Sequence, residues 1–256
     1  MHSRTRTIFL AIAVILASGI PFAQTQQSFA ESPCTHSPRS GTTPSNRHSG
    51  VSRSVGSTIG GVYAQIARYN VPYIQHSLNG TVVDYAMLKT STGSQYTQFG
   101  WAYSNATGAG GASVEVFTET ANSSGGVDLR FGAAPVGSSV PYFTILYNYV
   151  PGRFTFQLNG SQWLPYGVSG GYNPLAVFLP VSSEIAGETI YYNDQMAGDT
   201  TSYVGHYDSH LYVGSWQTFG GTTFSEVSSE FGVDPAPGSS PYSGVQFYTW
   251  DKRCPN

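Results

Sequence analysis

From about residue 59 to its end, the chain carries short runs of β-forming residues with turn-forming residues between them. Runs such as 82–88, 96–101 and 113–119 are rich in β-branched and aromatic residues, and many alternate apolar with polar side chains. Clusters of Gly, Ser, Asn and Pro, such as 108–111, separate the runs. No window of the length of a helix, about 11 residues, shows a helical period. The pattern therefore predicts an all-β fold, a two-sheet antiparallel β-sandwich of the jelly-roll or concanavalin-like type.

The first 30 residues have the order of a cleavable export signal. Arg4 and Arg6 precede an apolar run over 8–17, and Ser28-Phe29-Ala30 then offers small residues to a signal peptidase. An uncleaved membrane anchor is the alternative, but the run is shorter than the roughly 20 residues that span a bilayer. We therefore expect residues 1–30 to be a signal peptide and the mature protein to be secreted, extracellular and free of the membrane.

Two further segments follow the signal. Residues 31–58 are Ser, Thr, Pro, Gly, Arg and His with almost no large apolar side chain, so we expect a flexible arm there. Residues 59–256 are expected to form a single β-sandwich domain, since such domains often exceed about 200 residues as one unit. We expect this domain to be a monomer.

The chain carries few charges and none of the commonest catalytic motifs. Charged residues make up 10% of it, the net charge is -3, and no basic block is present, which argues against nucleic acid as a partner. Gly-x-Ser-x-Gly, Gly-Lys-Ser/Thr and His-Glu-x-x-His are all absent from the sequence. His206 and His210 are four residues apart, a spacing that brings ligands together on a helix but not on a strand, so we expect a polar turn. No metal and no cofactor is predicted.

The two cysteines, Cys34 and Cys254, lie near opposite ends of the mature chain. An even number of cysteines in an exported protein favours pairing, with two free thiols as the alternative. A bridge would close nearly the whole mature chain, and the chain-entropy model assigns about 4–5 kcal/mol to a loop of that length. We expect a Cys34–Cys254 disulfide.

Several of the 14 acidic residues lie within strand-like runs, although strand interiors are depleted in Glu. Because side chains alternate along a strand, Glu115 and Glu119 share one face, and so do Glu184 and Glu188. Gln98 likewise shares a face with small residues, opposite to the face of Trp101. This arrangement fits a sheet with one packed side and one concave, ligand-exposed side, and it equally fits a solvated outer face.

The order of several short motifs resembles that of neprosin-type domains. The motifs are Gly61–Ile66, the Asn70-Val71-Pro72 segment, Gln98-Phe99-Gly100-Trp101, 114–119 and 186–191. Neprosins carry a Glu or Gln two residues before a Gly-Trp, and later a Gly-Glu-Val segment on a strand. Fungal glutamic peptidases of the eqolisin family show a related pair, a Gln before Thr-Gly and a later Glu in an Ala-Glu-aromatic strand. The sequence departs from the pattern of plant neprosins in showing neither their cysteine-rich segment nor their large N-terminal activation domain, so we do not expect the zymogen regulation that the resemblance would otherwise imply.

The resemblance implies a peptidase that works in acid with Gln98 and Glu188 as a catalytic dyad. Glu188, as a carboxylate, would take a proton from the attacking water and return one to the leaving amine. Gln98 would position the water and donate a hydrogen bond to the oxyanion. Glu115 would be a nearby substrate-binding carboxylate. Trp101 would line the substrate groove if its strand bends toward it, or belong to the core, which its position on the opposite face favours.

A second function fits the same sequence. A lectin-like, non-catalytic β-sandwich would bind carbohydrate by stacking sugar rings on exposed aromatic side chains, for which Trp163, Trp216 and Trp250 are candidates. The substrate or ligand is therefore a polypeptide in the first reading and a carbohydrate in the second.

Overall fold

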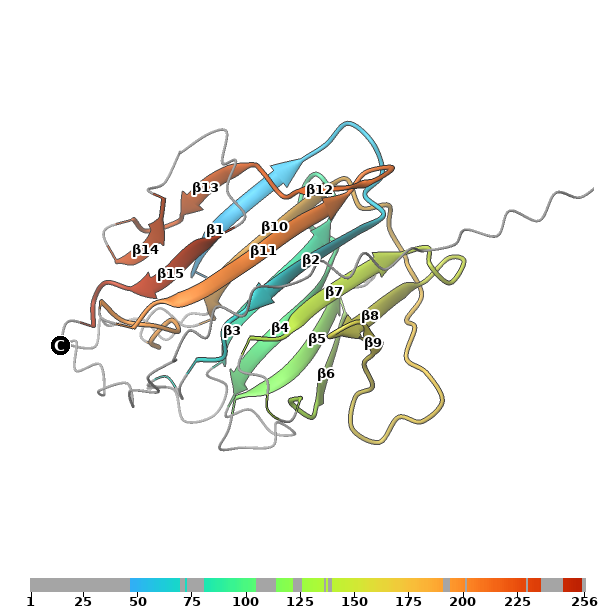
Figure 1. The fold of residues 1–256 in the computed structure, drawn as a ribbon, viewed down its shortest axis with the longest axis horizontal. Coiled ribbons are helices and arrows are strands. Elements are labelled where there is room, and N and C mark those ends of the chain that lie inside the picture. Colours follow the sequence, from blue (N-terminus) through green and yellow to red (C-terminus); the bar gives the residue numbers. More distant parts are fainter. Residues whose placement is uncertain are drawn as a thin grey trace, which may run out of the picture.

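The computed structural model describes residues 47–69, 72, 81–104, 114–121, 126–135, 137, 140–190, 194–200, 202–228, 230–235 and 246–254. Within these residues the chain forms strands, turns and irregular segments but no helix, and two antiparallel sheets lie one over the other (Figure 1). The predicted all-β two-sheet sandwich is confirmed. None of the described residues belongs to a helix long and apolar enough to cross a membrane.

The first sheet has seven strands. Their spatial order is β13 (Thr222–Ser225), β1 (Arg47–Ser54), β10 (Ser182–Thr189), β3 (Thr81–Lys89), β4 (Tyr96–Ser104), β5 (Glu115–Ala121) and β6 (Val127–Gly132). Every neighbouring pair in it is antiparallel. Strands far apart in the sequence thus become neighbours, with β10 lying between β1 and β3.

The second sheet has eight strands. Its path runs β14 (Phe231–Asp234), β15 (Phe247–Asp251), β11 (Val204–Tyr212), β2 (Gly61–Ile66), β7 (Tyr142–Tyr147), β8 (Phe154–Leu158) and β9 (Ser161–Gln162), and β12 (Trp216–Thr218) pairs with β11. The pairing of β2 with β11 is interrupted by a register shift between Tyr207 and His210.

The main core fills the space between the sheets. Alternate side chains of both sheets, such as Val82, Phe99 and Ile185 on one and Phe143 and Ile145 on the other, are fully buried there. This is the arrangement that period-2 alternation dictates when each sheet turns one face inward.

Trp101 belongs to this core, the placement that its position on β4 favoured, so its alternative role as a substrate-binding residue in a groove is wrong. Its side chain is 0% exposed, its ring packs against Phe143, and its indole nitrogen donates to the carbonyl of Ile66 at 2.9 Å. The physical reason is parity: Trp101 is three residues from Gln98 and therefore points to the opposite face of β4.

Trp101→Ala is expected to lower the free energy of unfolding by about 3–5 kcal/mol, because it leaves a large cavity and an unpaired carbonyl. Urea unfolding followed by circular dichroism measures the loss. Trp216→Ala is the matched control, since Trp216 is 40% exposed and its loss should cost only about 1 kcal/mol. Equal losses at the two positions would contradict the assignment of Trp101 to the core.

The flexible arm expected over residues 31–58 is wrong for its last part. Residues Arg47–Ser54 form β1, which pairs with β10 on one side and β13 on the other. The segment is poor in apolar residues, but its backbone is paired on both edges, and Gly50 allows a close approach: a Cβ there would lie 2.7 Å from Ala186 Cβ. Tertiary pairing therefore overrides a composition that is typical of disorder.

The structure corrects the turn expected at His206 and His210, and it leaves the expected disulfide and signal peptide untested. The segment around His206 and His210 is strand β11 with a bulge, not a polar turn, and His206 is buried beside Asp84 with a nitrogen–oxygen distance of 3.3 Å. Cys254 is buried and is not a free thiol, whereas Cys34 lies outside the described residues, as does the expected signal peptide over 1–30. The Cys34–Cys254 bridge and the export of the protein stay predictions.

Candidate active site

The face of the seven-stranded sheet that is turned away from the core carries a second cluster of side chains. Its apolar members are Val83, Tyr85, Met87, Ala102, Phe117 and Ala186. The polar ones are Gln98 on β4, Glu115 and Glu119 on β5, and Glu184 and Glu188 on β10. Since Glu184 and Glu188 are only 3% and 6% exposed, this is not the solvated outer face that the sequence left open.

Gln98 and Glu188, the two residues of the expected dyad, lie on this same face. They stand on β4 and β10, the two neighbours of β3. In the strand register, Gln98 is opposite Met87 and Met87 is opposite Glu184, so Glu184 is directly in line with Gln98. Glu188 lies four residues further along β10, opposite Val83.

Glu119 on β5 interacts with both residues of the expected dyad, with Gln98 through a hydrogen bond and with Glu188 through its charge. It is opposite Gln98 in the register, and the Gln98 side chain hydrogen-bonds to it. The Tyr96 phenol also donates to Glu119. Burial nevertheless raises the pKa of Glu119, and its charge in turn raises the pKa of Glu188.

The carboxyl group of Glu188 favours its neutral form. Burial is the largest cause, followed by repulsion from Glu119 and Glu184, and together they raise the pKa of Glu188 from 4.5 to about 8. In the acidic range Glu188 is therefore protonated. The ionised base that the resemblance implies is not the form that this environment favours, because desolvation costs a carboxylate more than a carboxylic acid.

Gln98 combines burial with an unused acceptor. Its side chain is 4% exposed, and its carbonyl oxygen has no hydrogen-bond partner among the described residues. Because a buried polar atom without a partner costs about 1–3 kcal/mol, such atoms mark places where a ligand or water completes the hydrogen bonding.

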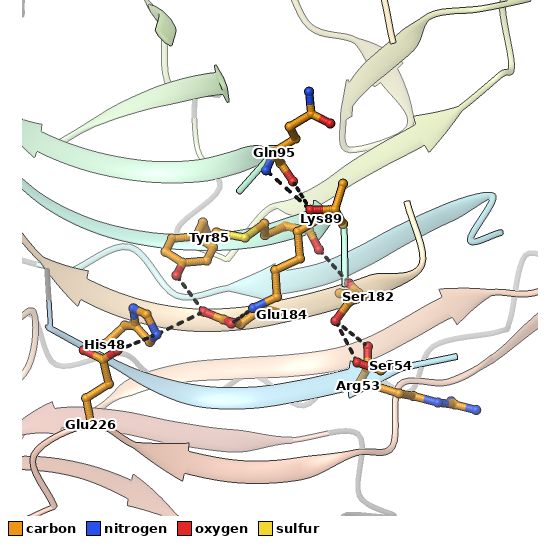
Figure 2. Close-up of polar contacts among 12 residues, drawn as sticks. His48, Arg53, Ser54, Tyr85, Lys89, Gln95, Ser182, Glu184 and Glu226 are labelled. Carbon is orange, nitrogen blue, oxygen red and sulfur yellow. Dashed lines mark hydrogen bonds and ion pairs between the residues drawn. The ribbon is translucent and has the colours of Figure 1, made fainter. Parts of the chain in front are cut away.

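Glu184 is engaged differently from Glu188. It accepts a hydrogen bond from the Tyr85 phenol at 2.8 Å and forms an ion pair with Lys89 (Figure 2). His48 of β1 lies 4.0 Å from the same carboxylate and 3.2 Å from Glu226. The three groups that surround Glu184 come from β3 and β1, and Glu226, in the turn after β13, contacts His48, so only the strand order brings the four together.

Glu115, the expected substrate-binding carboxylate, lies on the same face near one end of β5. It is 9% exposed and accepts a hydrogen bond from the Tyr166 phenol at 3.1 Å. Sequence reasoning placed Glu119 on one face with Glu115 without giving it a role, and it missed Tyr85, Lys89, Tyr96 and His48. Strand alternation does place Tyr85 and Lys89 on one face of β3, but it gives no signal for which strands lie beside it.

Solved structures with a similar fold are known, although the sequence itself matches little. A comparison with protein-family models gave no match, and neither did a comparison with curated proteins. The fold resembles that of scytalido-glutamic peptidase. Its structure with a transition state analog inhibitor aligns with a TM-score of 0.51 and 11% identity, covering 82% of this chain and 100% of that chain.

A second solved structure gave a weaker alignment. SCP-B, a member of the Eqolisin family of peptidases in a complex with the tripeptide Ala-Ile-His, aligns with a TM-score of 0.46 and 10% identity. At these identities the likeness is one of fold, and the expected resemblance to neprosin-type domains stays a prediction.

Proposed function

We propose that this protein is a secreted peptidase that hydrolyses polypeptides in acid, with Gln98 and a protonated Glu188 as the reacting pair. The observation that carries the proposal is the buried polar cluster itself: an amide with an unused acceptor and a neutral carboxyl group share one face of a sheet. The likeness of the fold to scytalido-glutamic peptidase supports it.

A neutral carboxyl group can give and take a proton in one step. Its O–H donates to the scissile carbonyl oxygen while its other oxygen accepts a proton from the attacking water. The result is a neutral gem-diol and a carboxyl group that is again protonated. In the second step the carboxyl donates its proton to the amide nitrogen and accepts one from a gem-diol hydroxyl, so that the amine leaves and Glu188 is restored.

Gln98 holds the reactants in this scheme. Its carbonyl oxygen accepts a hydrogen bond from the attacking water, and one amide hydrogen is already committed to Glu119. The second amide hydrogen is available to the oxygen on which charge develops, an interaction worth about 3–4 kcal/mol in a buried site. An amide at position 98 also adds no further negative charge to a face that already carries several carboxyl groups.

Gln98→Ala is expected to lower kcat/KM for casein by about 10²- to 10³-fold, since it removes the water-positioning oxygen and the oxyanion donor. The measurement uses the purified mature protein between about pH 3 and pH 9, a range that spans the titration of Glu188. Gln65→Ala, on β2 of the other sheet, is the matched control and should leave kcat/KM unchanged. Absence of cleavage by the unmodified protein throughout this range would contradict the proposal.

A carbohydrate-binding function is the second candidate, and one observation favours it. On the eight-stranded sheet, Trp216 is 40% exposed and Tyr63 stacks on His210 with ring centroids 4.8 Å apart. Exposed rings of this kind can stack on sugars. Of the tryptophans expected as platforms, Trp163 is in the core and is 5% exposed, so it is excluded.

A further inference from the structure

The Lys89–Glu184 ion pair occupies the position next to the proposed catalytic carboxyl group, and the mechanism above does not use it. Glu184 is 3% exposed, whereas the Lys89 side chain is 21% exposed and reaches the carboxylate from the end of β3. A nearby ammonium ion stabilises negative charge on a carboxylate. Glu184 is thus a buried anion that stands four residues from Glu188 on the same face of β10.

Tyr85 lies between the two carboxyl groups. In the register it is opposite Ala186, the residue midway between Glu184 and Glu188, and its side chain is fully buried. Its phenol is 2.8 Å from Glu184 and is also within hydrogen-bonding reach of Glu188. A phenol has a single proton to donate, so the two carboxyl groups compete for it.

Resting on the proposed function, we propose that Glu184, charged through its pairing with Lys89, is a positioning residue that accepts the hydrogen bond of the Tyr85 hydroxyl and so keeps Glu188 protonated for catalysis. Two effects act in the same direction. The charge on Glu184 repels a charge on Glu188, and a phenol that donates to Glu184 stabilises an ionised Glu188 less than one that donates to Glu188 alone.

None of the other described ionisable groups around Glu188 donates a hydrogen bond to it that would favour its ionised form. Glu119 on β5 and Glu226 after β13 are carboxylates that disfavour its ionisation. Tyr96 on β4 donates to Glu119. On β1, His48 is opposite Glu188 in the register, and its imidazole contacts Glu226 and Glu184. Lys89 is paired with Glu184.

The test is the pKa of Glu188 in Glu184→Gln, in Tyr85→Phe and in the double variant. Titration of the Glu188 carboxyl carbon by ¹³C NMR gives this pKa whether or not the protein cleaves peptides, and Glu188→Gln assigns the signal. The high-pH limit of casein cleavage gives it independently if the protein is a peptidase. A failure of the proposed function therefore leaves this inference testable.

Glu184→Gln is expected to lower the pKa of Glu188 by about 1 unit or more, because it removes the repelling charge and leaves the Tyr85 hydroxyl a weaker, neutral acceptor at position 184. In the Tyr85→Phe background the same substitution should give a smaller shift, since only the charge effect remains. An unchanged or raised pKa in Glu184→Gln would overturn the proposal, and so would shifts of equal size in the two backgrounds. If Glu184→Gln alone does not fold, Lys89→Met with Glu184→Gln removes both charges and carries the same expectation of a lowered pKa.

Discussion

Glu188→Gln is expected to lower kcat/KM for casein by about 10²- to 10⁴-fold, the range that a general acid–base group contributes. Glutamine has the shape of a protonated glutamate but no proton that it can transfer. The variant should therefore keep the fold and the contact with Tyr85 while losing both proton-transfer steps. Cleavage assays with a fluorogenic casein, at acidic and neutral pH, measure the loss.

Two other carboxylates serve as comparisons for this result. Asp208→Asn removes a charge from β11 of the other sheet and should leave kcat/KM unchanged. Glu184→Gln should stay active in acid, with its high-pH limit moved downward. If Glu184→Gln lost all activity while Glu188→Gln remained active, the reacting carboxyl group would be Glu184, which is the one in line with Gln98.

The free energy of unfolding should fall as pH rises from about 4.5 to about 8, by up to about 5 kcal/mol. In the folded protein Glu188 keeps its proton up to a pKa of about 8, whereas its ordinary value is 4.5. Between these values the unfolded chain loses the proton and the folded chain retains it, so rising pH favours unfolding. The contribution is fully present below pH 4.5 and is lost once pH passes the folded-state pKa. Burial raises the pKa of Glu119 as well, which adds to the same trend.

Urea unfolding at about pH 4.5, 6 and 8 measures this dependence. Glu188→Gln should be about as stable as the unmodified protein at the lowest pH and more stable by several kcal/mol at the highest, because its side chain never ionises. Asp208→Asn should follow the unmodified protein at every pH. Parallel curves for Glu188→Gln and the unmodified protein would show that Glu188 is not the group responsible.

The two results together would connect stability with function at one residue. A carboxyl group that is buried among other carboxylates destabilises the fold at neutral pH, and the same burial keeps the proton that catalysis needs in acid. A destabilising buried group of this kind is expected where a site is arranged for chemistry rather than for stability.

The local pattern of the sequence determined which side chains share a face. Alternation along a strand placed Gln98 opposite to Trp101 on the two faces of β4, and placed Glu184 and Glu188 on one face of β10. The number of β-forming runs and the turn residues between them determined the two-sheet architecture. These features depend only on residues that are close together in the sequence, so they can be recognised without knowing which strands pair.

Only the tertiary structure decided which strands lie side by side. The order β10–β3–β4–β5 brings Glu188, Tyr85, Gln98 and Glu119 to one face, and it recruits β1 from a segment with the composition of a flexible arm. The raised pKa of Glu188 and the pairing of Glu184 with Lys89 follow from that order. Pairing between strands distant in sequence depends on how both faces of the sheet are buried across the whole chain, and no local period of residues encodes it.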